Sequence, residues 1–379
     1  MTQEVMGADA GGGALGCRVS GSQQCWAALY TLVADAAQST LDHADSSINN
    51  HPNPSPACGV SVQSGLLHRF LFEGLPVRGA LVRVNSAWRE VLARREVSGA
   101  FPAPVRSLLG EMAAAGLLMH SNIKFDGALI LQLHGAGPLK LAVAEISADL
   151  SFRATAQVIG EVVDDARLPQ LVNHGGRCAI TLDARDRPTG TMPYQGIVPL
   201  YGDEGEPLRA LSEVLEHYML QSEQLDTRLI LAANDDVAAG LLLQRMPRGG
   251  VGNLGGERDE ERIGLDEDFN RIAHLGASLT REELLNADAD AILRRLFWQE
   301  DLRRFEARAV AFRCSCSRER VQSMLLGLGR EELDDILAER GRIEVGCDFC
   351  GLQYHFDNID VGGMFTPALD LSASPQTLQ

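Results

Sequence analysis

The amino-acid sequence predicts an α+β protein. We expect a core domain of mixed sheets and helices at 65–247, a helical linker region at 248–308 and a small C-terminal domain at 309–366. Three observations lead to this prediction. Strand-like alternation and helix-like periodicity follow one another along the core segment. A Gly-rich, charged stretch interrupts that pattern at 248–263, and four cysteines near the C-terminus form two short clusters.

The core domain is predicted from alternating and amphipathic segments in succession. Alternation from Val77 to Val84 predicts a strand, and the segment 105–119 predicts a buried helix because it is apolar nearly all round. Alternating runs on both sides of a Gly/Pro turn predict a β-hairpin at 125–146. The remaining predicted elements are helices at 88–95 and 208–222 and strands at 154–161, 177–183, 196–200, 228–232 and 240–246.

The linker region is predicted to begin as a flexible charged stretch and to continue as short helices. Gly250, Gly252 and Gly255 fit the pattern G-x-G-x-x-G, but no βαβ unit surrounds them, and this disfavours nucleotide binding. Thr280-Arg-Glu-Glu283 is a capping box that begins a helix. A following apolar stripe predicts a helix face that must dock on another surface: Ile292, Leu293, Leu296 and Phe297.

Composition and charge exclude several classes of function. The sequence has 34 Lys and Arg against 51 Asp and Glu, and its net charge of −17 disfavours binding to nucleic-acid phosphates. It has no apolar run of about eighteen residues, so neither a transmembrane helix nor a membrane partner is expected. The N-terminus lacks the basic and apolar regions of a signal peptide. Together with eight cysteines, four of them in metal spacing, this predicts a reducing, cytoplasmic location.

The two ends of the chain are predicted to lie outside the folded domains. Segment 1–64 is rich in Gly, Ala, Ser and Asn, and we expect a disordered N-terminal extension there. Its thiols Cys17, Cys25 and Cys58 lack metal spacing and are expected to be free, and no role is assigned to Cys178. Residues 367–379 are expected to form a tail.

Four cysteines form the predicted metal site: Cys314, Cys316, Cys347 and Cys350. Structural zinc takes four soft ligands in a tetrahedron, and two cysteine pairs brought together by the fold supply them. The second pair has the spacing of a zinc knuckle, followed by Gly351 where a tight turn needs backbone freedom. The first pair, with one residue between its cysteines, has a less common spacing. His355 is a weaker candidate ligand, since we expect it on a strand outside a closed shell of four sulfurs.

Two interpretations of this site stay open from the spacing alone. A four-cysteine zinc site is most often purely structural and only stabilises a small domain. A zinc-bound thiolate is also a nucleophile toward peroxide or hypochlorous acid, and a sulfenic acid formed there condenses with a neighbouring thiol. Loss of the thiolates removes the metal, and metal-binding energy in a small domain is largely folding energy. The site is then a switch between a zinc-bound folded state and an oxidised unfolded state.

Several stretches of the sequence resemble one family, the bacterial redox-regulated heat-shock chaperones of thirty-three kilodaltons. They follow the order of that family and together span roughly residues 66–365. The most specific is Phe312-Arg-Cys-Ser-Cys-Ser-Arg-Glu-Arg320 together with Cys347-Asp-Phe-Cys-Gly351. The others are His68-Arg-Phe-Leu-Phe-Glu73, Val77-Arg-Gly79, Lys124-Phe-Asp-Gly127, Gly137-Pro-Leu-Lys-Leu-Ala-Val143, Tyr194-Gln-Gly196, Gln221-Ser-Glu-Gln-Leu225 and Leu242-Leu-Gln-Arg-Met-Pro247.

The resemblance implies an ATP-independent holdase chaperone with a C-terminal zinc-binding redox-switch domain. The reduced protein is then inactive and binds Zn²⁺ through the four clustered cysteines. Oxidation is expected to form the disulfides Cys314–Cys316 and Cys347–Cys350 and to release the metal. The linker then unfolds and uncovers a surface for unfolded or oxidatively damaged client proteins, and the active form is a homodimer. This implication favours the switch over the purely structural site.

The sequence departs from the family in three places. Segment 1–64 has no counterpart in typical members, so it is either a genuine extension or the product of a gene start set too early, with the true start nearer Val60. The Gly-rich insert at 248–263 lengthens the hinge. The position of His355 is usually not histidine, and this is expected to have a modest effect on zinc affinity.

Two other classes of function compete with the chaperone. One is a zinc-ribbon adaptor or nucleic-acid-binding protein with a purely structural zinc, which the acidic residues around the cysteines disfavour. The other is an enzyme, which we do not expect because four cysteine ligands leave zinc no open coordination position.

Overall fold

The structure is a computed structural model that describes residues 17–19, 65–96, 99–173, 175–187, 191–246 and 259–365. Within these residues the chain forms two compact units. The larger unit comprises 65–314, and the smaller unit comprises 17–19 and 315–365. Residues 247–258 with the G-x-G-x-x-G pattern, the C-terminal tail and nearly all of segment 1–64 lie outside the described residues. Residues 259–263, predicted as part of the flexible stretch, are helical.

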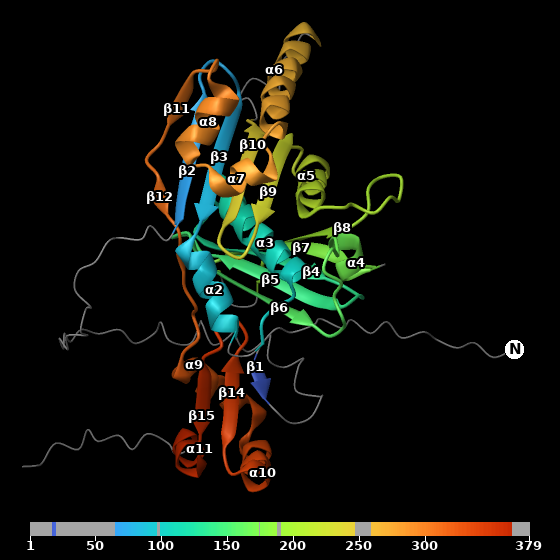
Figure 1. The fold of residues 1–379 in the computed structure, drawn as a ribbon. Helices are drawn as coiled ribbons and strands as arrows, with labels where there is room; N and C mark the ends of the chain where they lie inside the picture. Colours follow the sequence, from blue (N-terminus) through green and yellow to red (C-terminus); the bar gives the residue numbers. More distant parts are fainter. Residues whose placement is uncertain are drawn as a thin grey trace, which may run out of the picture. The chain divides into compact units, whose positions relative to one another are not determined.

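The first sheet of the larger unit is antiparallel, with the strand order β11–β2–β3–β10–β9. Strand β12 also pairs with β2, so two short strands of the linker region lie along one edge of the sheet (Figure 1). The bounds of the strands are Gly65–Phe72 for β2, Val77–Val84 for β3, Thr227–Ala233 for β9, Ala238–Arg245 for β10, Leu302–Arg304 for β11 and Arg308–Ala309 for β12.

The second sheet of the larger unit has the strand order β13–β6–β5–β4–β7–β8. Its pairs are antiparallel except for β13, which runs parallel to β6. The strands are β4 at Gly127–His134, β5 at Leu139–Ile146, β6 at Ser151–Val158, β7 at Arg177–Ala184, β8 at Tyr194–Pro199 and β13 at Ala311–Phe312. The predicted hairpin at 125–146 is thus the pair β4–β5.

Helix α3 (Ala103–Asn122) packs against both sheets and forms the centre of the main core (Figure 1). Two glycines let it approach each sheet closely. A Cβ added at Gly110 would lie 2.4 Å from Cβ of Ala233 in the first sheet, and one at Gly116 would lie 2.2 Å from Cδ1 of Ile146 in the second. The core prediction for 105–119 is confirmed, because α3 is buried on nearly all sides. The other core helices are α2 at Ser86–Glu96, α4 at Leu168–Val172 and α5 at Leu211–Gln221.

Three helices of the linker region cover the opposite face of the first sheet: α6 (Asp259–Ala277), α7 (Arg281–Asn286) and α8 (Ala289–Phe297). Their apolar residues join Phe70, Phe72 and Leu241 of the sheet in a second core cluster. The predicted apolar stripe of α8 is buried there, with Phe297 edge-on to Phe72 at a centroid distance of 5.0 Å. The capping box is also confirmed, since Thr280 Oγ1 accepts from Glu283 N at 3.2 Å.

The smaller unit has a three-stranded sheet in the order β1–β14–β15 and its own apolar cluster. Strand β1 (Cys17–Val19) pairs with β14 (Ile343–Cys347), and β14 pairs with β15 (Gln353–Phe356). The helices are α9 at Arg318–Leu328, α10 at Arg330–Arg340 and α11 at Asn358–Met364. Strands β14 and β15 form an antiparallel hairpin around the second cysteine pair. Helix α10 ends at Gly341, which has a left-handed φ of 75°.

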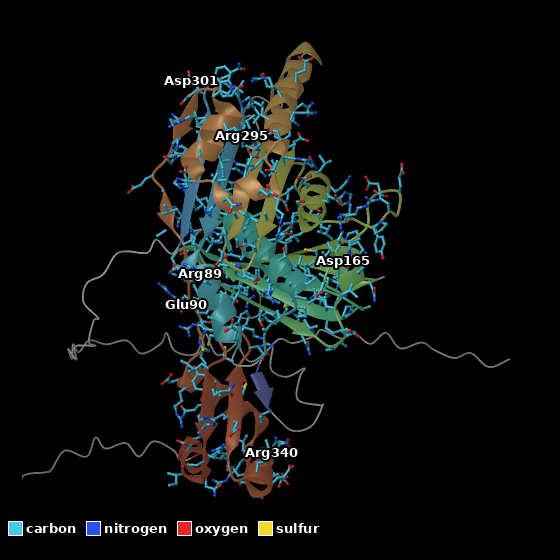
Figure 2. All side chains as sticks on the ribbon, viewed as in Figure 1. Arg89, Glu90, Asp165, Arg295, Asp301 and Arg340 are labelled. Carbon is cyan, nitrogen blue, oxygen red and sulfur yellow. The ribbon has the colours of Figure 1, made fainter. Side chains whose placement is uncertain are left out.

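Residues 309–314, which we predicted as the start of the C-terminal domain, cluster with the larger unit. The reason is strand β13, which pairs with β6 at two positions, Ala311 with Ser151 and Phe312 with Phe152. Exposed charged side chains include Asp165 and Arg295 of the larger unit and Arg340 of the smaller unit (Figure 2). Among the described residues, no helix is both long enough and apolar enough to cross a lipid bilayer.

Candidate metal centre

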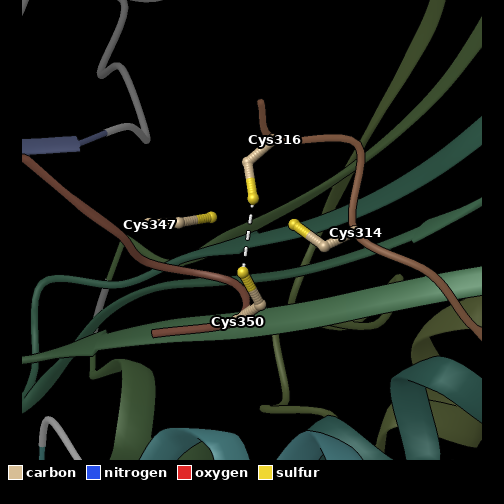
Figure 3. Close-up of side chains that lie close together, drawn as sticks. All are labelled: Cys314, Cys316, Cys347 and Cys350. Atoms are coloured by element: carbon tan, nitrogen blue, oxygen red, sulfur yellow. Dashed lines mark hydrogen bonds between the residues drawn. The ribbon is translucent and has the colours of Figure 1, made fainter. Parts of the chain in front are cut away.

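The structure brings the four predicted cysteines together. The sulfurs of Cys314, Cys316, Cys347 and Cys350 all lie within 4.8 Å of one another and form no disulfide (Figure 3). Cys316 Sγ and Cys350 Sγ are 3.3 Å apart. In a tetrahedral Zn–S₄ site with Zn–S bonds of about 2.3 Å, neighbouring sulfurs lie roughly 3.8 Å apart. The four thiols therefore fit a single zinc ion in both donor type and spacing.

The first cysteine pair precedes helix α9. Ser317 is the N-cap of α9, with Oγ accepting from Arg320 N at 3.3 Å, and Arg320 Nη1 donates to Ser315 O at 2.7 Å. These bonds fix the short loop that carries Cys316. The N-terminus of α9 directly follows this loop.

Cys347 of the second pair is the last residue of β14, and Cys350 lies in the turn that leads to β15. Cys347 N donates to Leu352 O at 2.9 Å, and Gly351 N donates to Cys347 O at 2.8 Å. Gly351 has a φ of 71°, which confirms the predicted need for backbone freedom at this position. The turn points both sulfurs of the pair at the other two, and both residues are buried.

Tyr354 of β15 is a neighbour of the centre that the sequence did not reveal. Its hydroxyl hydrogen-bonds the side chain of Cys316, and burial and this bond together raise the pKa of Tyr354. A hydroxyl that donates to a thiolate lowers the charge density on the sulfur. No motif signals such a residue, because its role follows only from the pairing of β15 with β14.

The other candidate residues, His355 and the remaining cysteines, either lie away from the metal centre or have side chains outside the described residues. His355 is on β15, but its Nδ1 lies 3.7 Å from Glu344 Oε1 and it is not part of the four-residue group. Cys178 is fully buried in the main core. The side chains of Cys17, Cys25 and Cys58 lie outside the described residues.

Comparison with known proteins identifies the family. The family model described as Hsp33 protein matches residues 65–357. The chain belongs to the Hsp33 family. Similar curated proteins include the 33 kDa chaperonin of Chromobacterium violaceum, which is 48% identical over 79% of this chain and 93% of its own length. That of Methylobacillus flagellatus is 42% identical over 79% of this chain and 94% of its own.

The fold is also that of a solved Hsp33 homologue. The crystal structure of the 33 kDa chaperonin from Thermotoga maritima superposes with a TM-score of 0.65 at 20% sequence identity. The match covers 80% of this chain and 97% of that protein. The α+β fold is thus shared with this Hsp33 structure.

Proposed function

We propose that this Hsp33-family protein is a redox-regulated, ATP-independent holdase that binds unfolding proteins in the cytoplasm and prevents their aggregation. One observation carries the proposal: the sulfurs of four cysteines lie within 4.8 Å of one another in a chain whose relatives are named 33 kDa chaperonins. Such a cluster suits zinc when reduced and disulfides when oxidised. The same donor set leaves zinc no open coordination position, which supports a binding role rather than an enzymatic one.

The proposed switch is a two-electron oxidation of each cysteine pair. In the reduced, inactive form the four thiolates hold Zn²⁺. Hydrogen peroxide then converts Cys314 with Cys316, and Cys347 with Cys350, into two disulfides. Four thiolates lose four electrons in total, and two peroxide molecules take up these electrons with four protons to give four water molecules. Zn²⁺ leaves as the hydrated ion because no thiolate remains to bind it.

Loss of zinc is proposed to act through folding energy. The apolar cluster of the smaller unit is small, and in domains of this size metal-binding energy is a large part of the folding energy. We propose that the linker helices α6–α8 then leave the first sheet. Their departure uncovers its apolar face, including Phe70, Phe72 and Leu241, for client proteins. The uncovered face also supports the proposal of a homodimer in the oxidised state.

The test combines zinc release with an aggregation assay on the full chain. We expect peroxide at mild heat to release about one zinc per chain and to suppress aggregation of an unfolding client protein. The matched control is Cys178→Ala, which alters a cysteine outside the cluster and should behave like the wild type. Zinc release without any change in client aggregation would reject the holdase function and would indicate that the zinc is purely structural.

A further inference from the structure

The chain segment that leads into the metal centre, Arg308–Cys314, is held on strand β6 and the turn before it. Arg308 Nη2 donates to Ala148 O at 3.1 Å, and Arg313 N donates to Phe152 O at 3.1 Å. Arg313 Nη1 also pairs with Asp149 Oδ2 at 2.8 Å. Between these two arginines, β13 adds its parallel pairing with β6. The segment is therefore docked by these polar contacts together with Val310, which is fully buried in the main core, and Phe312, which packs against that core.

One further contact of this segment is made by the cysteine itself. Arg153 of β6 pairs with Glu145 of β5, with Nη2 2.7 Å from Oε2, and its side chain is only 16% exposed. The same guanidinium hydrogen-bonds the side chain of Cys314. Glu145 and Cys314 together raise the pKa of Arg153 despite its burial. The buried cation thus has two anionic partners, one in the core sheet and one at the metal centre.

We propose that Arg153 is the residue through which the larger unit detects the oxidation state of Cys314. While this sulfur is a thiolate, the guanidinium shared with Glu145 anchors the segment Arg308–Cys314 on β6. When the sulfur enters a disulfide, the anchor is lost and the segment detaches. The direction of this signal rests on the proposed function. Arg153 acts through Cys314 and is a positioning residue, since it touches neither a client nor the oxidant.

The physical basis is the change in the sulfur as a hydrogen-bond acceptor. A thiolate carries negative charge, also when it is shared with zinc, and forms a charge-assisted bond with a guanidinium. Disulfide formation removes two electrons from the pair of sulfurs, and peroxide with two protons takes them up to give two water molecules. A disulfide sulfur is neutral and accepts only weakly. Arg153 keeps Glu145, so no unpaired buried charge remains and the core stays folded.

Detachment of this segment reaches the linker region by direct chain continuity. Ala311 lies two residues after β12, which pairs with the edge of β2, and β11 pairs with the same strand. Both strands are two or three residues long, so each contributes few hydrogen bonds. An oxidised Cys314 therefore weakens the last in a series of short contacts that hold the C-terminal part of the linker region on the first sheet.

The anchor is tested by hydrogen exchange of the full, zinc-saturated chain. We expect amides of 308–313 in reduced Arg153→Met to exchange about tenfold faster or more than in the reduced wild type, because a charge-assisted hydrogen bond is lost. Peroxide should accelerate the exchange of these amides by a similar factor in the wild type, and by less than about twofold in the variant. Arg153→Lys should restore part of the protection. Arg187→Met, which removes another poorly exposed arginine paired with an aspartate, should resemble the wild type.

A second variant separates this role from damage to the core. Arg153→Met leaves Glu145 without its cation, so Arg153→Met/Glu145→Gln removes both charges at once. Fast exchange at 308–313 in the reduced double variant, with β4 and β5 still protected, supports the anchor. Protection at the level of the reduced wild type overturns it. This comparison needs no oxidant, so its outcome does not depend on whether the protein is a holdase. The proposed holdase function is rejected by a different result, namely unchanged client aggregation after oxidation of the wild type.

Discussion

Arg281 of the linker helix α7 reaches Glu111 in the middle of the core helix α3, with Nη1 3.7 Å from Oε1. The other terminal nitrogen of Arg281 donates to Ala233 O and, at 3.4 Å, to Ser107 Oγ. Both residues line a cavity of about 840 Å³. Burial raises the pKa of Glu111 to about 7, and the long ion pair with Arg281 only partly opposes this effect. Arg281 of the docked linker thus covers the carboxyl group of Glu111, which is poorly solvated.

Glu111→Gln is predicted to remove a pH dependence of linker docking. A carboxyl group whose pKa is raised stabilises the docked state below its ordinary value of about 4.5, and this stabilisation is lost as pH rises through about 7. The wild-type linker should therefore be released more easily at pH 7.5 than at pH 5, by at most about 3 kcal/mol. The variant should show little change over this range, measured by hydrogen exchange of α7 in the reduced protein.

The control for this prediction is Glu90→Gln, which alters an exposed carboxylate paired with Arg94 on α2. It should keep the wild-type pH profile. If Glu111→Gln also kept the wild-type pH profile, the pH dependence of linker docking would be due to other charged groups that line the cavity. These are Arg106, Asp164, Asp165, Arg167, Arg209, Asp235 and Asp236.

Thr280→Ala is predicted to loosen α7 without affecting the core sheets. The Thr280 side chain and backbone exchange hydrogen bonds with Glu283, and loss of such a cap costs about 1 kcal/mol. Amide exchange in α7 should rise about fivefold in the reduced protein, because α7 opens locally. Ser278→Ala removes an exposed hydroxyl outside the helix as a control. Equal protection of α7 in both variants would show that packing of Leu284 and Leu285 alone holds it.

The sequence predicted those parts of the fold whose signal is local. Strand β3 has the predicted bounds Val77–Val84, because side chains alternate over its full length. Strand β6 was predicted at 154–161 but lies at Ser151–Val158. It begins directly after Leu150, a non-glycine residue at a φ of 63°, and no sequence signal marks such a turn. The four clustered cysteines were predicted because thiol spacing is itself the signal.

Contacts that depend on tertiary pairing were not predicted. Strands β11, β12 and β13 have two or three residues each, too few for a period to show, and they exist only because β2 and β6 offer free edges. The partners of the cysteines, Tyr354 and Arg153, were missed for the same reason. Each is set beside a sulfur by strand register and not by distance along the chain.

Cys178 is predicted to be chemically silent in the folded protein. It is fully buried, and burial raises its pKa to about 12, so almost no thiolate forms at neutral pH. Cys178→Ala should leave the number of thiols that react with a disulfide reagent unchanged in the native protein and lower it by one in denaturant. A lower count in the native variant would show that this part of the core opens under native conditions.

Tyr354→Phe is predicted to make the metal centre react faster with peroxide. The Tyr354 hydroxyl hydrogen-bonds Cys316, and its removal returns charge density to that sulfur. A hydrogen bond of about 1 kcal/mol corresponds to roughly a fivefold rate change. Zinc release after addition of peroxide, followed with a chromogenic chelator, should accelerate by about that factor. Tyr194→Phe removes a hydroxyl of the larger unit that contacts Glu223 instead and should keep the wild-type rate. Equal rates in Tyr354→Phe and the wild type would mean that the attacked sulfur is not Cys316.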